Sequence, residues 1–177
     1  MTAKKGRKKN NAPARSAARL AAVQALYHVE LSGHTPDHVL DDFLKHHIGL
    51  KVSIAPSGDD DIGGAEVEHS LTEPDPLLLT SLFRGTFARR EALDEMIGGA
   101  LSADWSVERL ESVLRAILRV GAYELADCPD VPVRVAISEY VDIAHAFYSG
   151  PEPGLVNAVL DRIGRVVRAD EIGGDGR

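Results

Sequence analysis

Few side chains in this 177-residue chain have the spacing that catalysis or metal binding requires. His34 and His38 are four residues apart, but we expect one in a loop and the other in a helix, so we interpret them as surface histidines rather than zinc ligands. The single cysteine, Cys128, could act as a nucleophile only beside a base, and His145 is the one nearby in the sequence. We therefore predict no metal site and no cofactor.

Patterns for phosphate binding and acid–base chemistry are equally weak. Gly98-Gly99 follows no expected strand and precedes no Gly-Lys-Ser/Thr, so it does not resemble a phosphate-binding loop. Glu139 and Asp142 lie three residues apart on an expected helix, where we favour a structural role over proton transfer. We predict no catalytic residues and a protein that is not an enzyme.

Positive charge is concentrated at the N-terminus. The first 19 residues contain no acid and seven basic residues, which are Lys4, Lys5, Arg7, Lys8, Lys9, Arg15 and Arg19. Because this segment contributes +7 to a net charge of −7, the rest of the chain carries −14. Arg15 and Arg19 are four residues apart on one helix face, and guanidinium groups bind phosphates bidentately. The pattern predicts a polyanion bound at one edge; the alternative is a tail that only aids solubility.

A second candidate site surrounds a glycine–proline turn. Phe147 closes one expected helix, Gly150-Pro151 form the turn, and Leu155 and Asn157 open the next helix. Aromatic rings at such a position can stack unpaired bases, and an asparagine can hydrogen-bond base edges. The alternative is that Phe147 belongs to the core.

Helices must position these side chains. The chain is 44% hydrophobic but only 5% aromatic, which favours aliphatic helix packing. Thr35 before Pro36 and Asp75 before Pro76 are predicted N-caps, and Ser106 is a third. Apolar periodicity predicts helices over residues 13–31, 36–46, 76–100, from about 106, over 132–148 and over 154–168.

The domain organisation follows from this pattern. We expect one all-α domain, with a disordered basic arm (1–13), N-terminal helices (14–48), an acidic disordered insert (49–75), a helical bundle (76–168) and a disordered tail (169–177). A short strand near residues 50–54 would lack a partner. No apolar run reaches the roughly 18 residues of a membrane span, and the single cysteine fits a reducing compartment, so we expect a cytoplasmic protein.

Four sequence blocks, in this order, resemble the NusB family of bacterial transcription antitermination factors. The first is Arg15 and Arg19 followed by Ala-Val-Gln-Ala-Leu-Tyr (22–27), and the second is Trp105 followed by Ile-Leu-Arg-Val-Gly-Ala-Tyr-Glu-Leu (117–125). The third is Asp-Val-Pro (130–132) with Ile-Ser-Glu (137–139), and the fourth is Val-Asn-Ala-Val-Leu-Asp (156–161). The resemblance covers residues 15–165 apart from the insert. Leu155 stands where the family usually has phenylalanine, and Leu114 where an acidic residue is frequent.

The resemblance implies a fold of two packed helical bundles with about six to seven helices. It also implies binding of the boxA element of ribosomal RNA transcripts together with NusE, a small-subunit ribosomal protein, on the RNA polymerase elongation complex. The RNA-binding residues would be the seven cations named above with Phe147, Leu155 and Asn157. A homodimer is one alternative for the oligomeric state.

The partner surface is predicted on two helices. Tyr27 and the helix carrying Val113, Leu114 and Leu118, which is apolar over more than half its circumference, would bind NusE; the alternative is that these residues are core. Two other functions stay open. One is a helical adaptor that binds proteins without RNA specificity, and the other is the NusB-like domain of a ribosomal RNA methyltransferase, although no S-adenosylmethionine loop is recognisable.

Overall fold

Helices dominate the computed structural model, which describes residues 11–46, 51–52, 69–70, 72–103 and 105–173. Their bounds are α1 Ala12–Ser32, α2 Pro36–His46, α3 Pro76–Ala88, α4 Arg90–Ala100, the 3-10 helix η1 Val107–Arg109, α5 Ser112–Asp127, α6 Val133–Phe147, α7 Glu152–Val167 and α8 Ala169–Gly173. Two strands of two residues each, β1 Lys51–Val52 and β2 His69–Ser70, complete the described elements. The all-α class is confirmed.

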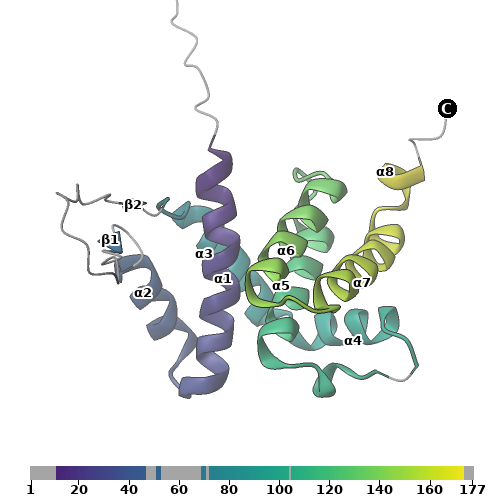
Figure 1. Ribbon diagram of the computed structural model, residues 1–177, viewed down its shortest axis with the longest axis horizontal. Helices are drawn as coiled ribbons and strands as arrows, with labels where there is room; N and C mark the ends of the chain where they lie inside the picture. The colour runs from purple at the N-terminus through teal and green to yellow at the C-terminus, as the bar shows by residue number, and fades with distance from the viewer. Residues whose placement is uncertain (1–10, 47–50, 53–68, 71, 104, 174–177) are drawn as a thin grey trace, which may run out of the picture.

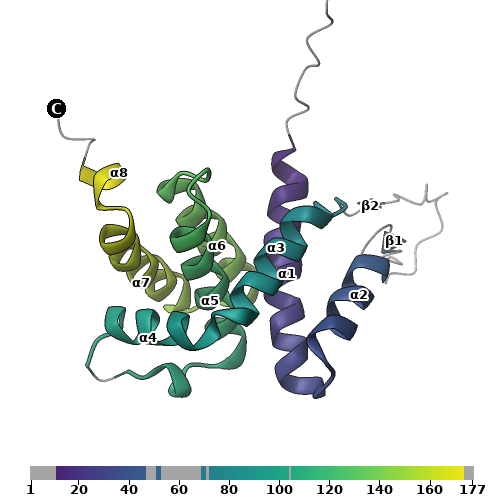
Figure 2. The ribbon, with the colours of Figure 1, turned by 180° about the vertical axis from the view of Figure 1, so that it is seen from behind.

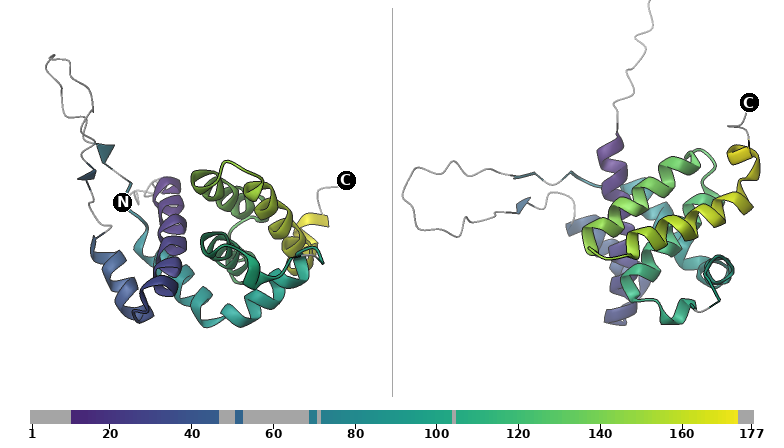
Figure 3. Two further views of the ribbon diagram at one scale, coloured as in Figure 1. Left: turned by 60° about the horizontal axis from the view of Figure 1, so that its bottom comes forward. Right: turned by 45° about the vertical axis from the view of Figure 1, so that its right-hand side comes forward.

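The helices form two bundles that meet where α1 packs against α5. The first bundle contains α1, α2 and α3, and the second contains α4, α5, α6 and α7. In Figure 1, α2 lies on one side of α1, while α5, α6 and α7 lie on the other. Figure 2 shows α3 running beside α1 and α4 crossing next to α5 and α7. The left view of Figure 3 shows the same division, with α1 between α2 and the C-terminal helices. The predicted two-bundle fold is therefore confirmed.

Small residues let the central helices approach closely. Ala18, Ala22 and Ala25 of α1 are fully buried. At Gly121 of α5, a Cβ atom would lie 2.8 Å from a methyl group of Leu160 on α7, nearer than atoms can pack. The alanine-rich face of α1 therefore allows its neighbours to approach closely, and Gly121 allows α7 to approach α5.

Caps and breaks set the helix ends. The Asp75 carboxylate accepts hydrogen bonds from the backbone N–H groups of Leu77 and Leu78, and Thr35 Oγ1 accepts one from His38 at 3.4 Å, so both predicted caps are confirmed. Ser106 makes no such cap, and a 3-10 turn precedes α5.

The single helix predicted over residues 76–100 was wrong. The chain breaks at Arg89, whose φ of −108° and ψ of 13° end α3 and start α4. The break is needed because α3 buries Leu82 and Phe83 against the first bundle, whereas α4 buries Leu93 and Ile97 against the second.

Two predictions of disorder also need correction. Lys51 pairs with Ser70 and Val52 with His69 in an antiparallel ladder, so the strand near residue 50 finds its partner within the same insert. Residues 169–173, expected in a disordered tail, form α8, from which the Glu171 carboxylate accepts a hydrogen bond from the Val133 N–H at 2.8 Å. The rest of the insert from 53 to 68, residue 71 and residues 174–177 lie outside the described residues.

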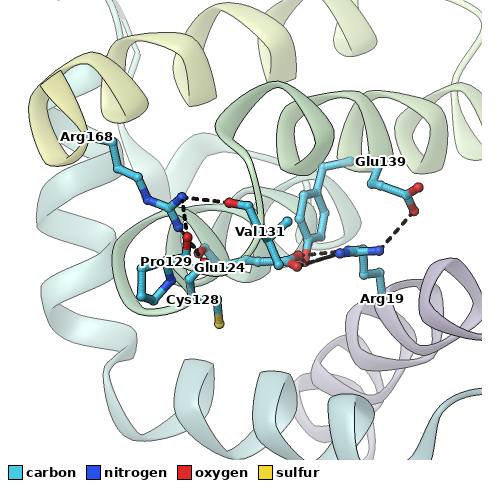
Figure 4. A network of polar contacts seen from close by, with 8 residues as sticks. Arg19, Glu124, Cys128, Pro129, Val131, Glu139 and Arg168 are labelled. Carbon is cyan, nitrogen blue, oxygen red and sulfur yellow. Dashed lines mark hydrogen bonds and ion pairs between the residues drawn. The ribbon is translucent and has the colours of Figure 1, made fainter. Parts of the chain in front are cut away.

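Arg168 fastens the turn between α5 and α6. Its guanidinium donates a hydrogen bond to the backbone carbonyl of Leu125 at 2.8 Å. It also donates to the carbonyls of Cys128 at 2.5 Å and Val131 at 2.6 Å (Figure 4). These carbonyls belong to the end of α5 and the turn behind it, where no intrahelical donor is available. The Arg168 side chain, at the end of α7, therefore holds the turn between α5 and α6 against α7.

Candidate nucleic-acid and partner interface

Arg19 turns inward instead of toward solvent. Its side chain is 3% exposed, and its Nε and Nη2 atoms lie 2.9 and 2.7 Å from the two carboxylate oxygens of Glu124 (Figure 4). Its Nη1 atom lies 3.4 Å from Glu139. The structure contradicts the prediction that Arg19 contacts RNA, because a guanidinium enclosed by two carboxylates has no face left for a phosphate.

Glu124 is the residue that sequence reasoning missed. It is fully buried and also accepts a hydrogen bond from Tyr140 Oη at 2.6 Å. Burial, followed by the Glu124 carboxylate, raises the pKa of Tyr140 well above its ordinary value, so the phenol remains a donor. A signal was available in the sequence, since Glu124 follows Gly121 by three residues and Ile117 by seven, on the apolar face of the helix. These contacts join α1, α5 and α6 at one point.

Arg15 is the described cation that remains at the start of α1. It lies one turn before Arg19 and is partly exposed. The Ala14 carbonyl next to it accepts a hydrogen bond from the Asp75 N–H at 2.9 Å, which fixes this end of α1 against the start of α3. The five predicted cations of the arm, at positions 4, 5, 7, 8 and 9, lie outside the described residues.

The turn between α6 and α7 presents an aromatic ring to solvent. Phe147 is 43% exposed, which excludes the alternative that it is core, and Asn157 is exposed on the first turns of α7. The Arg19–Glu139 contact places α6 beside the first turns of α1. Phe147 follows Glu139 by eight residues, or about 12 Å along the helix. Phe147 therefore lies about two helical turns along α6 from the Arg19–Glu139 contact.

A hollow of about 510 Å³ opens beside this turn. Its lining comes from the segment between α4 and α5 and from the starts of α5 and α7, and consists of Trp105, Arg109, Glu111, Leu114, Tyr148, Pro151, Glu152 and Leu155. The Trp105 side chain is 50% exposed. Tyr148 Oη and Glu152 Oε2 are buried and lack a hydrogen-bond partner. The hollow thus offers mainly apolar surface, and these two oxygen atoms are not accessible to solvent.

The four predicted partner residues occupy different environments. Leu118 is fully buried and Leu114 is 4% exposed, so both are core residues, and the prediction that they form an open partner patch was wrong. The wide apolar face of α5 is explained by its central position, where α1, α3, α4, α6 and α7 all pack against it. Tyr27 and Val113 are only partly buried and remain available at the surface.

Charged groups surround the end of α1 that carries Tyr27. Glu30, one turn further along, pairs with Arg115 at 3.0 Å and with Arg119 at 2.5 Å, and Arg119 also pairs with Asp94 at 2.7 Å. The hydrogen bond that Arg119 donates to Asp94 is the largest cause of the raised pKa of Arg119. These pairs hold α1, α4 and α5 together beside Tyr27.

The predicted absence of metal and nucleophile sites can be compared with the described residues. The His34 ring lies 6.1 Å from that of His28 and 5.1 Å from that of His38, centroid to centroid, yet no three potential ligands in the described residues are placed to hold a metal ion. Burial raises the pKa of Cys128, and so do the nearby carboxylates of Glu124 and Asp127, which opposes formation of a nucleophilic thiolate. No described helix is long and apolar enough to cross a membrane.

Comparison with known proteins covers nearly the whole described chain. The NusB family model matches residues 16–165. Transcription antitermination protein NusB of Rhodospirillum rubrum is 50% identical over 161 residues, which cover 90% of this chain and 87% of that protein. The protein of the same description from Rhizobium rhizogenes is 42% identical over 156 residues, covering 88% of this chain and 89% of that protein.

Solved structures share the fold at lower identity. T. maritima NusB superimposes with a TM-score of 0.67 at 23% identity and covers 90% of this chain and 96% of its own. A structure of the antitermination factors NusB and NusE in complex with double-stranded RNA gives a TM-score of 0.63 at 22% identity, over 85% of this chain and 96% of that one. Both likenesses concern the arrangement of helices.

Proposed function

Because the chain belongs to the NusB family, we propose that it is an RNA-binding transcription antitermination factor. The carrying observation is the continuous match over residues 16–165, with half of the residues identical to a relative described as an antitermination protein. In its specific form, the protein binds boxA RNA together with NusE and acts on the elongating RNA polymerase. This function needs no catalytic group, in keeping with a raised Cys128 pKa and a buried Glu124.

The charge distribution supports the RNA part of the proposal. Apart from the internally paired Arg19, six cations precede residue 20 in a chain whose net charge is −7, so phosphates are attracted to the start of α1 and repelled elsewhere. From Arg15, the surface along α6 leads to Phe147 and Asn157. An RNA single strand bound there would place phosphates at Arg15 and the arm, and bases at the turn between α6 and α7.

A binding titration tests this function. Labelled boxA RNA and a scrambled RNA of the same composition are titrated with the full chain, alone and with NusE, and fluorescence anisotropy reports binding. We expect boxA to bind more tightly than the scrambled RNA and NusE to increase the affinity. Binding of NusE with no detectable RNA binding would instead identify a protein-binding adaptor.

Arg15 and the arm are expected to set the salt dependence of RNA binding. Each lost phosphate contact should reduce the slope of log K against log salt by about 0.7 for a single strand and weaken all sequences alike. Removal of residues 1–9 deletes five cations and should reduce the slope several times more than Arg15→Ala does. Arg165→Ala, which removes an exposed cation near the far end of α7, is the control. An unchanged slope in both test variants would contradict the electrostatic interpretation.

Tyr27 is expected to contribute to NusE binding without being essential for folding. Since Tyr27 is only partly buried, Tyr27→Asp should keep most of the melting temperature and weaken NusE binding at least tenfold, as the loss of an aromatic interface residue commonly does. Leu118→Asp is the contrasting variant, because a charge at a fully buried position should unfold the protein. Normal NusE affinity in a folded Tyr27→Asp variant would place the partner surface elsewhere.

A further inference from the structure

The first turn of α1 is weakly stabilised by its own residues. Its N-cap, Asn11, makes no side-chain hydrogen bond to the backbone of the turn, and the turn contains no acidic residue. Arg15 adds a positive charge near the positive end of the helix dipole, where a cation is unfavourable. Contacts from another element are therefore needed to hold the backbone that carries Arg15.

Asp75 supplies these contacts from the start of α3, which runs beside α1 (Figure 2). Its backbone N–H donates a hydrogen bond to the Ala14 carbonyl at 2.9 Å. Its Oδ1 atom accepts from the N–H groups of Leu77 and Leu78 at 3.0 and 3.1 Å and so caps α3. Its Oδ2 atom lies 3.5 Å from the side-chain nitrogen of Asn11, which donates the longest of these bonds. One residue therefore joins the starts of two helices.

We infer that Asp75 is a positioning residue for RNA binding, which holds Arg15 where its guanidinium meets a phosphate. Arg15 directly follows Ala14 and is partly exposed, so the bond from Asp75 fixes the backbone at the root of this side chain. The Asp75 carboxylate also places a negative charge at the start of α1, where it interacts favourably with the helix dipole. The inference rests on the proposed RNA-binding function and adds to it a residue that acts through Arg15.

A first turn that is already ordered strengthens binding of a phosphate. Ordering a frayed backbone on binding costs conformational entropy, and a turn held in helical geometry avoids that cost. The effect is confined to the first turn, because Arg19, one turn later, is held separately by Glu124 and Glu139. Loss of the Asp75 contacts is therefore expected to loosen Arg15 without releasing the rest of α1.

Three substitutions at position 75 separate these contributions. Asp75→Pro removes the carboxylate and the N–H together, and the φ of −64° at this position suits proline. Asp75→Ala removes the carboxylate and keeps the N–H. Asp75→Asn keeps an acceptor for both helices, since asparagine caps a helix as well as aspartate does. Thr35→Ala is the matched control, because it removes the cap of α2 beyond the opposite end of α1.

Anisotropy titrations of labelled boxA RNA at several salt concentrations measure the effect. We expect Asp75→Pro to reduce the slope of log K against log salt by about 0.7, the value of one phosphate contact to a single strand. Asp75→Ala should weaken binding less, because the bond to Ala14 remains. Asp75→Asn and Thr35→Ala should keep the slope of the unaltered chain. Hydrogen exchange of the amides of residues 14–18 should be fastest in Asp75→Pro.

A double variant tests whether Asp75 acts through Arg15. In an Arg15→Ala background, Asp75→Pro should cause no further loss of RNA affinity, because the contact that it positions is already absent. Its effect on hydrogen exchange of the first turn should remain. If the two substitutions weaken RNA binding additively, Asp75 acts by another route and the inference is wrong.

The outcomes separate this inference from the proposed function. If the unaltered chain binds no boxA RNA, both fail. If the chain binds RNA and a folded Asp75→Pro variant keeps its affinity and salt slope, only the positioning role of Asp75 is overturned. An Arg15→Ala variant that binds like the unaltered chain also overturns it, since no contact is then positioned. If Asp75→Pro does not fold by circular dichroism, Asp75→Ala decides, and an unchanged RNA affinity in that variant contradicts the inference.

Discussion

Glu124→Ala is expected to destabilise the protein by about 3–5 kcal/mol, because it leaves the buried Arg19 guanidinium without its main counter-charge. The Tyr140 hydroxyl also loses its acceptor. Burial lowers the pKa of Arg19, but the hydrogen bond and the charge of Glu124 outweigh this effect and raise it. The guanidinium stays charged when Glu124 is removed, because arginine is not deprotonated in proteins. Urea denaturation monitored by circular dichroism measures the free energy of unfolding.

A control and a double variant show whether the ion pair itself is responsible. Glu95→Ala, on the exposed face of α4, should change the free energy of unfolding by no more than about 0.5 kcal/mol. Replacing both partners with apolar residues, as in Arg19→Met with Glu124→Leu, should recover much of the loss, since no buried charge then remains unpaired. A loss below about 1 kcal/mol in Glu124→Ala would contradict the assignment of this pair as the joint between α1 and α5.

Arg168→Ala is expected to lower the free energy of unfolding by about 3 kcal/mol. The substitution removes a charged donor from the carbonyls of Leu125, Cys128 and Val131. Of these, the Cys128 carbonyl keeps the hydrogen bond from the Val131 N–H at 3.1 Å. It also releases Glu171, whose carboxylate accepts from Arg168 at 3.1 Å. Thermal melting and hydrogen exchange of the segment around residues 125–133 report the change.

Arg165 supplies the matched control for Arg168. It lies one turn earlier on α7, is 63% exposed and pairs only with Asp161 on its own helix. Exposed pairs of this type contribute about 0–1 kcal/mol, so Arg165→Ala should leave the melting temperature nearly unchanged. Equal effects of the two substitutions would show that the carbonyl contacts of Arg168 do not stabilise the turn.

The inward position of Arg19 changes how the N-terminus is understood. Two arginines four residues apart share a helix face, but the face meets α5 and α6 at Arg19, whereas Arg15 is only partly buried. A variant that combines Arg15→Ala with Arg19→Ala would therefore confound loss of RNA contacts with unfolding. Arg15 and the arm have to be tested separately from Arg19.

The sequence by itself determined most of the helices and the starts of α2 and α3. Thr35, Asp75 and the prolines that follow them are local signals, since a cap needs only the next three residues, and α2 begins and ends where the apolar pattern predicted. The four family blocks identified the fold in the same way, because their residues and their order can be recognised without knowing which of them are in contact.

Tertiary structure alone decided which polar and apolar side chains face solvent. The pattern around Leu114 and Leu118 could not distinguish a partner surface from a central helix, since both need an apolar circumference, and only the packing of α5 among five other helices settled it. Arg19 and Glu124 are 105 residues apart, so their pairing depends on how α1 meets α5. The break at Arg89 also depends on tertiary structure. The residues before it pack in one bundle and the residues after it pack in the other, although the apolar pattern is helical throughout.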